Sequence, residues 1–83
     1  MKSLKSLTEL RRGEEGSVVF IQKGMIFRRR LNAIGITPGI KLRKISEAFL
    51  KGPVTVQVSN RRMAIGFGMA ARIFLQVEAD EAQ

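Results

Sequence analysis

The fold is decided by one stretch near the middle of the chain, Arg29-Arg30-Leu31-Asn32-Ala33-Ile34-Gly35-Ile36-Thr37-Pro38-Gly39. Apolar spacing predicts a helix over Met25–Ile34, and Gly35 stands where a residue with positive φ would end it. Pro38 and Gly39 match the second and third positions of a type II turn, because proline presets φ and glycine tolerates positive φ. We therefore interpret Gly35, Pro38 and Gly39 as a structural turn motif.

The predicted helix carries both an apolar stripe and three arginines. At about 100° per residue, the apolar side chains cluster on one stripe and beside it: Phe27, Leu31 and Ile34, with Ile26 and Ala33 next to them. Arg29 falls opposite the stripe, and Arg28 and Arg30 flank it. This arginine face is either solvated or a partner contact, and we take Arg28 and Arg29 as candidate binding residues.

Working outward from this stretch, short strands are predicted on both sides. They are rich in β-branched residues or alternate between apolar and polar positions: Ser17–Ile21, residues 40–43, Pro53–Val58, Arg62–Ile65 and Ile73–Val77. Ile45 breaks the alternation, so a bulge or a strand end is expected near Lys44. The first fifteen residues are interpreted as a polar lead-in in which Leu4, Leu7 and Leu10 form a short anchoring segment. Gly66–Ala71 is expected to be a helical or 3₁₀ turn.

A mostly β fold follows from this pattern. Closing short strands into a barrel removes exposed edges, so we expect a small five-stranded SH3-like barrel, with one short α-helix inserted after the first strand. An OB-like barrel is the alternative. At 83 residues the chain is long enough for one core. We expect a single domain over residues 1–83, with its body at about 7–78 and a tail at 79–83.

Charge is the strongest compositional signal. The chain has a formal net charge of +8, and the region from Gly16 to Val77 contains 11 basic residues and a single acid, Glu47. Such a body is attracted to an anionic surface, which could be nucleic acid, an acidic protein or anionic lipid.

Most catalytic and metal-binding chemistry lacks its usual residues. The chain contains no histidine, cysteine, tyrosine or tryptophan. Glu14, Glu15 and Glu47 fall on separate predicted elements, and ferrous iron prefers histidine and carboxylate ligands. Gly66-Phe67-Gly68 lacks the lysine and the serine or threonine of a phosphate-binding loop. We predict no enzyme, no catalytic residue, no metal ligand and no cofactor.

Two predicted turns could contact a partner. Phe49, Leu50 and Lys51 stand at a predicted hairpin tip, where exposed apolar groups beside a base can anchor a partner. The alternative is that Phe49 folds back over a barrel end. Arg61 and Arg62 at the next hairpin are further candidates. For Phe67 and Met69 between glycines, core packing is expected.

The sequence predicts a cytoplasmic protein. Its longest stretch without a charged residue is Leu31–Ile40, whereas a membrane-spanning helix needs about 20 apolar residues. The N-terminal residues Met1–Lys5 lack the apolar run of a signal peptide.

The stretch Arg29–Gly39 resembles the hallmark of the ferrous iron transport protein A family, arginine–leucine, two residues, then leucine–glycine–isoleucine–x–proline–glycine. Three further segments resemble that family's later strands: Lys41–Ile45, Gly52–Val58 and the region from Met63 to Ile73. The resemblance covers about Leu7 to Glu78. It implies an SH3-like barrel that acts beside a membrane permease with a cytosolic GTPase domain in bacterial ferrous iron uptake.

The function expected from the resemblance is therefore that of a non-enzymatic accessory protein. It would bind the permease's cytosolic GTPase region and could lie peripherally at the inner face of the membrane, near anionic lipid. The alternative is a basic nucleic-acid-binding barrel. Nucleic acid is disfavoured because such platforms stack bases on aromatic rings, and Phe20, Phe27 and Phe74 are predicted to be in the core.

Overall fold

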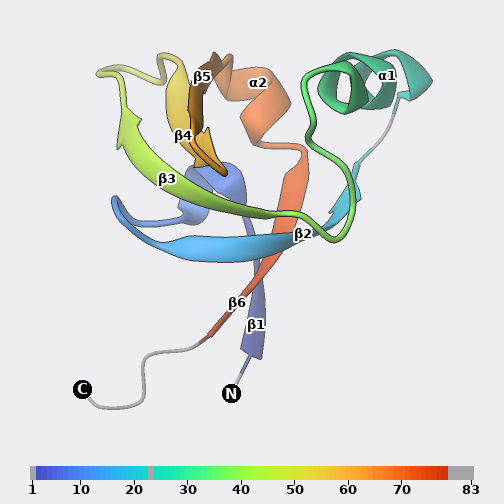
Figure 1. Ribbon diagram of the computed structural model, residues 1–83. Helices are drawn as coiled ribbons and strands as arrows, with labels where there is room; N and C mark the ends of the chain where they lie inside the picture. The colour runs from blue at the N-terminus through green and yellow to red at the C-terminus, as the bar shows by residue number, and fades with distance from the viewer. Residues whose placement is uncertain (1, 23, 79–83) are drawn as a thin grey trace.

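The computed structural model describes residues 2–22 and 24–78 of the protein (Figure 1). Their elements, in chain order, are β1 (Lys2–Ser6), the 3₁₀ helix η1 (Leu7–Glu9), β2 (Glu15–Ile21), α1 (Met25–Ala33), β3 (Lys41–Glu47), β4 (Val54–Val58), β5 (Arg61–Ile65), α2 (Phe67–Ala70) and β6 (Ile73–Glu78). The predicted mostly β class, with a short helix after the first predicted strand, is confirmed. The tail predicted at 79–83 lies outside the described residues.

The strands form one antiparallel sheet in the order β1-β6-β2-β3-β4-β5. In Figure 1 the sheet curls strongly, with β4 and β5 above β2 and β3 while β1 and β6 run away below them. β1 and β5 are the two edges of this order, so the curled sheet is an open barrel. Its interior is aliphatic, and the largest fully buried side chains include Leu7, Leu31, Ile36, Leu42 and Ile73.

The start of the chain is more structured than a polar lead-in. Lys2–Ser6 forms β1 and pairs with β6, from Lys2 opposite Glu78 to Ser6 opposite Phe74, so the sheet has six strands where the sequence predicts five. Leu7 and Leu10 are buried as the anchoring role requires, whereas Leu4 is exposed. The strand escapes prediction because the alternating polar residues of a solvent-facing edge strand resemble those of a loop.

The turn motif forms as predicted. Helix α1 ends with the paired bonds of a Schellman motif, in which the Ile36 amide donates to the Leu31 carbonyl at 2.8 Å and the Gly35 amide donates to the Asn32 carbonyl at 3.0 Å. Gly35 has φ of 90°. The following turn is closed by the Ile40 amide, which donates to the Thr37 carbonyl at 3.2 Å. Gly39 has φ of 99°, as the third position of a type II turn requires.

A bulge in β2 overturns the predicted burial of Phe20, and Phe27 and Phe74 are not fully buried either. The pairing of β2 with β6 shifts register between Val18 and Phe20. This extra residue switches the alternation, so Val18 and Ile21 face the core and Phe20 faces outward, 41% exposed. Phe74, opposite Phe20, and Phe27 on α1 are only half-buried. None of these three rings belongs to the buried core.

A second bulge lies where the sequence predicts one. The pairing of β3 with β4 shifts register between Lys44 and Ser46, and β3 continues beyond the bulge to Glu47. Leu42 and Lys44 are both buried. The side chain of Lys44 therefore points into the molecule, although its charge suggests a solvent position.

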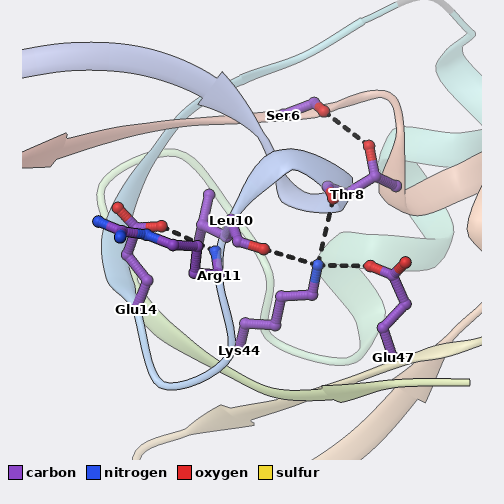
Figure 2. Close-up of polar contacts among 7 residues, drawn as sticks. All are labelled: Ser6, Thr8, Leu10, Arg11, Glu14, Lys44 and Glu47. Carbon is purple, nitrogen blue, oxygen red and sulfur yellow. Dashed lines mark hydrogen bonds and ion pairs between the residues drawn. The ribbon is translucent and has the colours of Figure 1, made fainter.

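The buried Lys44 ammonium joins β3 to η1 and to the residue that follows it (Figure 2). Lys44 is 3% exposed. Its Nζ donates to the Leu10 carbonyl at 2.8 Å and the Thr8 carbonyl at 3.2 Å, and it forms an ion pair with the Glu47 carboxylate. Because all three acceptors belong to the protein, the charge is compensated where water is excluded.

Glu14 closes the turn that follows. It accepts a hydrogen bond from the Arg11 amide at 2.8 Å (Figure 2) and lies 3.4 Å from the Lys5 ammonium. Partial burial raises the pKa of Glu14, but the Arg11 hydrogen bond and the charge of Lys5 outweigh it, so the pKa lies below its ordinary value. The carboxylate is therefore charged at neutral pH and links β1 to the turn before β2.

We expect Lys44→Met to lower the free energy of unfolding by about 2–3 kcal/mol, because it leaves two carbonyls of the η1 segment without their donor. Lys41→Met is the matched control, since Lys41 is exposed on the same strand; its effect should stay within about 0.5 kcal/mol. Urea unfolding followed by circular dichroism measures both. Equal stabilities of the two variants would contradict the assigned role of Lys44.

Gly39→Ala should cost about 1 kcal/mol of stability, because φ of 99° is strained for alanine even though no neighbouring atom would touch the added Cβ. Gly68→Ala provides the comparison, since its Cβ also meets open space and its φ is not positive. Thermal unfolding should show a lower midpoint for the first variant only. A Gly39→Ala protein as stable as Gly68→Ala would refute the turn assignment.

Candidate interaction surface

The β3–β4 hairpin tip projects two apolar side chains into solvent. Phe49 is 88% exposed and Leu50 is 82% exposed, so Phe49 does not fold back over the barrel. The turn is held by the Ala48 amide, which donates to the Pro53 carbonyl at 2.9 Å. Leu50 and Lys51 both have positive φ, of 57° and 58°, a region that costs a residue with a Cβ roughly 1 kcal/mol or more. The tip is therefore apolar, exposed and conformationally strained.

Two cation–π contacts connect the tip to the helices. The Lys51 ammonium lies 6.0 Å from the centre of the Phe67 ring on α2, and the Arg72 guanidinium lies 4.8 Å from the centre of the Phe27 ring on α1. Arg72 lies in the turn that follows α2, so the first contact joins the hairpin tip to α2 and the second joins the end of α2 to α1. In Figure 1 the tip, α2 and α1 lie along the same edge, away from β1.

Helix α1 exposes apolar and basic residues together. Met25 and Ile26 are 62% and 68% exposed, and Arg28, Arg29 and Arg30 are all exposed. Ile26 lies beside the apolar stripe in the predicted helix, but only Leu31 of this helix is fully buried. The position of the helix on the body thus leaves part of its apolar surface uncovered.

Arg61 and Arg62 have intramolecular partners. The Arg61 guanidinium donates to the Ile34 carbonyl at 3.2 Å, which satisfies a carbonyl at the end of α1. A Cβ on Gly35 would lie 2.8 Å from the same guanidinium, so glycine also gives Arg61 its space. Arg62 donates to the Gln57 side chain at 3.1 Å. Both arginines remain exposed, but Arg61 also caps a helix.

Several cations on this edge have no ion-pair partner among the described residues, whereas some cations elsewhere do. Lys44 is neutralised by Glu47, and Arg43 lies 3.6 Å from the Glu15 carboxylate. Within residues 2–22 and 24–78, no ion pair engages Arg28, Arg29 or Lys51. The edge therefore presents uncompensated cations to an anionic partner.

The seven candidates thus lie at the β3–β4 hairpin tip, on or against α1, and on the β4–β5 hairpin. The hairpin tip carries Phe49, Leu50 and Lys51, and α1 carries Arg28 and Arg29, with Arg61 bonded to the end of that helix and Arg62 on the β4–β5 hairpin. No group of three or more histidine, cysteine, aspartate or glutamate residues that could hold a metal ion occurs in the described part of the chain. Phe67 is half-buried beneath Lys51, and Met69 packs against the core.

Sequence reasoning missed an exposed aromatic pair. Phe20 and Phe74 stack with ring centres 4.9 Å apart and 13° between their planes, on the outer face of β2 and β6. The signal was present in Val18-Val19-Phe20-Ile21, because four apolar residues in a row cannot all face one side of a strand. It also missed the exposure of Met25 and Ile26.

Comparisons with known proteins place this geometry in a family. The FeoA domain matches residues 5–77 of the chain. The crystal structure of an iron uptake regulatory protein (FeoA) is 33% identical, with a TM-score of 0.79 and coverage of 88% of this chain and 95% of that chain. No curated protein matches the sequence.

Two further structures show how widely the fold occurs. FeoA of Stenotrophomonas maltophilia, described as a prokaryotic SH3 domain protein complexed with zinc, is 25% identical, with a TM-score of 0.72 and coverage of 86% of this chain and 93% of that chain. A manganese-dependent transcriptional repressor is 22% identical, with a TM-score of 0.84; 94% of this chain is covered, but only 44% of the repressor, so the likeness shows the fold alone.

The predicted SH3-like fold is therefore confirmed. The family match spans nearly all of the described residues and includes the helix, the Schellman motif and the type II turn. This chain belongs to the FeoA family of ferrous iron transport proteins.

Proposed function

We propose that this protein is a non-enzymatic regulator of ferrous iron uptake that binds the cytosolic GTPase region of the membrane iron permease. Membership of the FeoA family supports a role in ferrous iron uptake, and the related structure that is 33% identical is described as an iron uptake regulatory protein. The observation that carries the docking proposal is the hairpin tip, where Phe49 and Leu50 are almost fully exposed.

The hairpin tip is costly for the isolated chain. Exposed apolar side chains gain nothing from folding, and the positive φ of Leu50 and Lys51 adds backbone strain. Both costs would be offset if the tip inserted into an apolar pocket of a partner, as central hot-spot residues do. Phe49 and Leu50 are the anchors in this proposal, and Lys51 pairs with an acidic group beside the pocket.

Charge guides the encounter. The arginines of α1 and the exposed Arg61 and Arg62 give the protein a basic side that attracts an acidic surface. Such attraction increases the association rate and weakens with salt, since exposed charges are screened over about 8–10 Å at physiological ionic strength. The permease would supply the acidic surface and the GTPase chemistry, and this protein would act from the cytoplasm.

A nucleic-acid-binding barrel is the second candidate. The surface position of Phe20 and Phe74 favours it, because it removes the argument that all aromatic rings are buried. The two rings stack on each other, however, so each already has one face covered. Nucleic-acid binding does not explain why the hairpin tip exposes Phe49 and Leu50. We therefore favour the permease as the partner.

Leu50→Ser should weaken binding to the purified cytosolic GTPase region about tenfold or more, through loss of a buried apolar anchor. Leu4→Ser is the matched control, because Leu4 is also exposed but lies on β1, away from the tip. Calorimetric titration at low and high salt gives both affinities, and thermal unfolding shows that both variants are folded. Equal affinities for native and Leu50→Ser protein would rule out the anchor.

A further inference from the structure

The outward face of α1 differs from that of an ordinary surface helix, because it carries apolar side chains as well as charged ones. At about 100° per residue, Met25, Arg29, Ala33 and Ile26 fall within one arc of about 100°. Among the described residues, Met25 and Ile26 are the most exposed large apolar side chains outside the hairpin tip. The face turned away from the body thus combines apolar surface with arginine.

Folding does not account for this face. Helix α1 is attached to the body by Leu31, which is fully buried, by the cation–π contact of Phe27 with Arg72, and by the bond from Arg61 to Ile34. None of these contacts uses Met25 or Ile26. The N-terminal end of α1, where both residues lie, has no side-chain cap. Its apolar residues are therefore available to a second surface.

The positive charge around α1 favours an anionic binding partner for this face. The helix contains Arg28, Arg29 and Arg30 and no acidic residue, and Arg72 lies against its Phe27 ring. The nearest acid in sequence after Gly16 is Glu47, which is already paired with the buried Lys44. A surface that presents many negative charges in one plane would match three adjacent arginines.

The apolar part of the face favours lipid over nucleic acid. Met25 and Ile26 are aliphatic and offer no ring on which a base could stack, and the ring of Phe27 is already covered by a guanidinium. Long arginine side chains can reach phosphates while shorter apolar neighbours lie deeper. Helices with this combination lie in the plane of the membrane interface.

We propose that α1 is a peripheral membrane-docking helix that lies on the surface of an anionic bilayer. Met25 and Ile26 enter the boundary between headgroups and acyl chains, and Arg28, Arg29 and Arg30 bind lipid phosphates. None of the helices within the described residues is long and apolar enough to cross a membrane. This docking goes beyond the proposed permease binding, and its apolar contacts come from Met25 and Ile26 rather than from Phe49 and Leu50, so the two can be tested separately.

Vesicle binding of the purified protein tests the inference without the permease. The native chain should bind vesicles of phosphatidylcholine mixed with phosphatidylglycerol, and bind vesicles of phosphatidylcholine alone much less. The double variant Met25→Ser, Ile26→Ser should bind the mixed vesicles about tenfold less, although its net charge is unchanged. Leu4→Ser, exposed on β1, should bind as the native chain does. If the double variant also binds like the native chain, simple charge attraction explains the binding and the inference is wrong.

A single fluorophore can report the position of the helix, because the chain contains no tryptophan or tyrosine. The emission of Ile26→Trp should shift to shorter wavelength on mixed vesicles and be quenched by brominated lipid, whereas Leu4→Trp should show neither effect. An Ile26→Trp protein that binds vesicles without a shift would overturn the inference. So would a response to a single-stranded oligonucleotide in place of vesicles, which would assign the face to nucleic acid.

Permease binding separates the two proposals. Binding of the Met25→Ser, Ile26→Ser variant to the soluble GTPase region, measured without lipid, should equal that of the native chain. If this variant loses both vesicle binding and permease binding, α1 contacts the protein partner and the assignment to lipid fails. Loss of vesicle binding alone supports the inference, whatever affinity the hairpin tip shows for the GTPase region.

Discussion

A single buried ammonium holds the N-terminal segment to the barrel. Lys44 reaches from β3 to the carbonyls of Thr8 and Leu10, and Glu47 neutralises its charge (Figure 2). These bonds keep η1 in place, so that Leu7 and Leu10 fill the interior of the curled sheet. The position of η1 in turn directs β1 along β6. A polar interaction thus determines how the apolar core is completed.

Few contacts hold helix α1 in position. The Schellman motif at Gly35 and the turn at Gly39 return the chain to β3, and Leu31 with Ile36 provides the buried attachment. Arg61 completes the helix end by binding the Ile34 carbonyl. Because so few residues hold α1, most of its surface stays free, and this surface is basic and apolar. The hairpin tip is free in the same way, because Phe49, Leu50 and Lys51 are exposed and do not pack into the core.

Bulges decide which side chains face the solvent. The bulge near Lys44 could be predicted because Ile45 visibly breaks the alternation of β3. The bulge in β2 was hidden within a continuous apolar run, and it moves Phe20 from the interior to the outer face, where it stacks with Phe74. A shift of one residue reverses every side chain beyond it. Side-chain burial is therefore hardest to predict from periodicity in strands where apolar residues follow one another without a polar residue between them.

The sequence by itself determined the local structure of this protein: the helix that ends at Gly35, the turn at Pro38 and Gly39, the five strands from β2 to β6, the basic body and the position of the β3–β4 hairpin. These features depend on φ preferences and apolar spacing between near neighbours. Only the tertiary structure decided that Lys44 is buried, that Arg61 caps α1, that β1 joins the sheet, and that Met25 and Ile26 stay uncovered. Each of these outcomes depends on contacts between residues far apart in the chain, which local patterns do not encode.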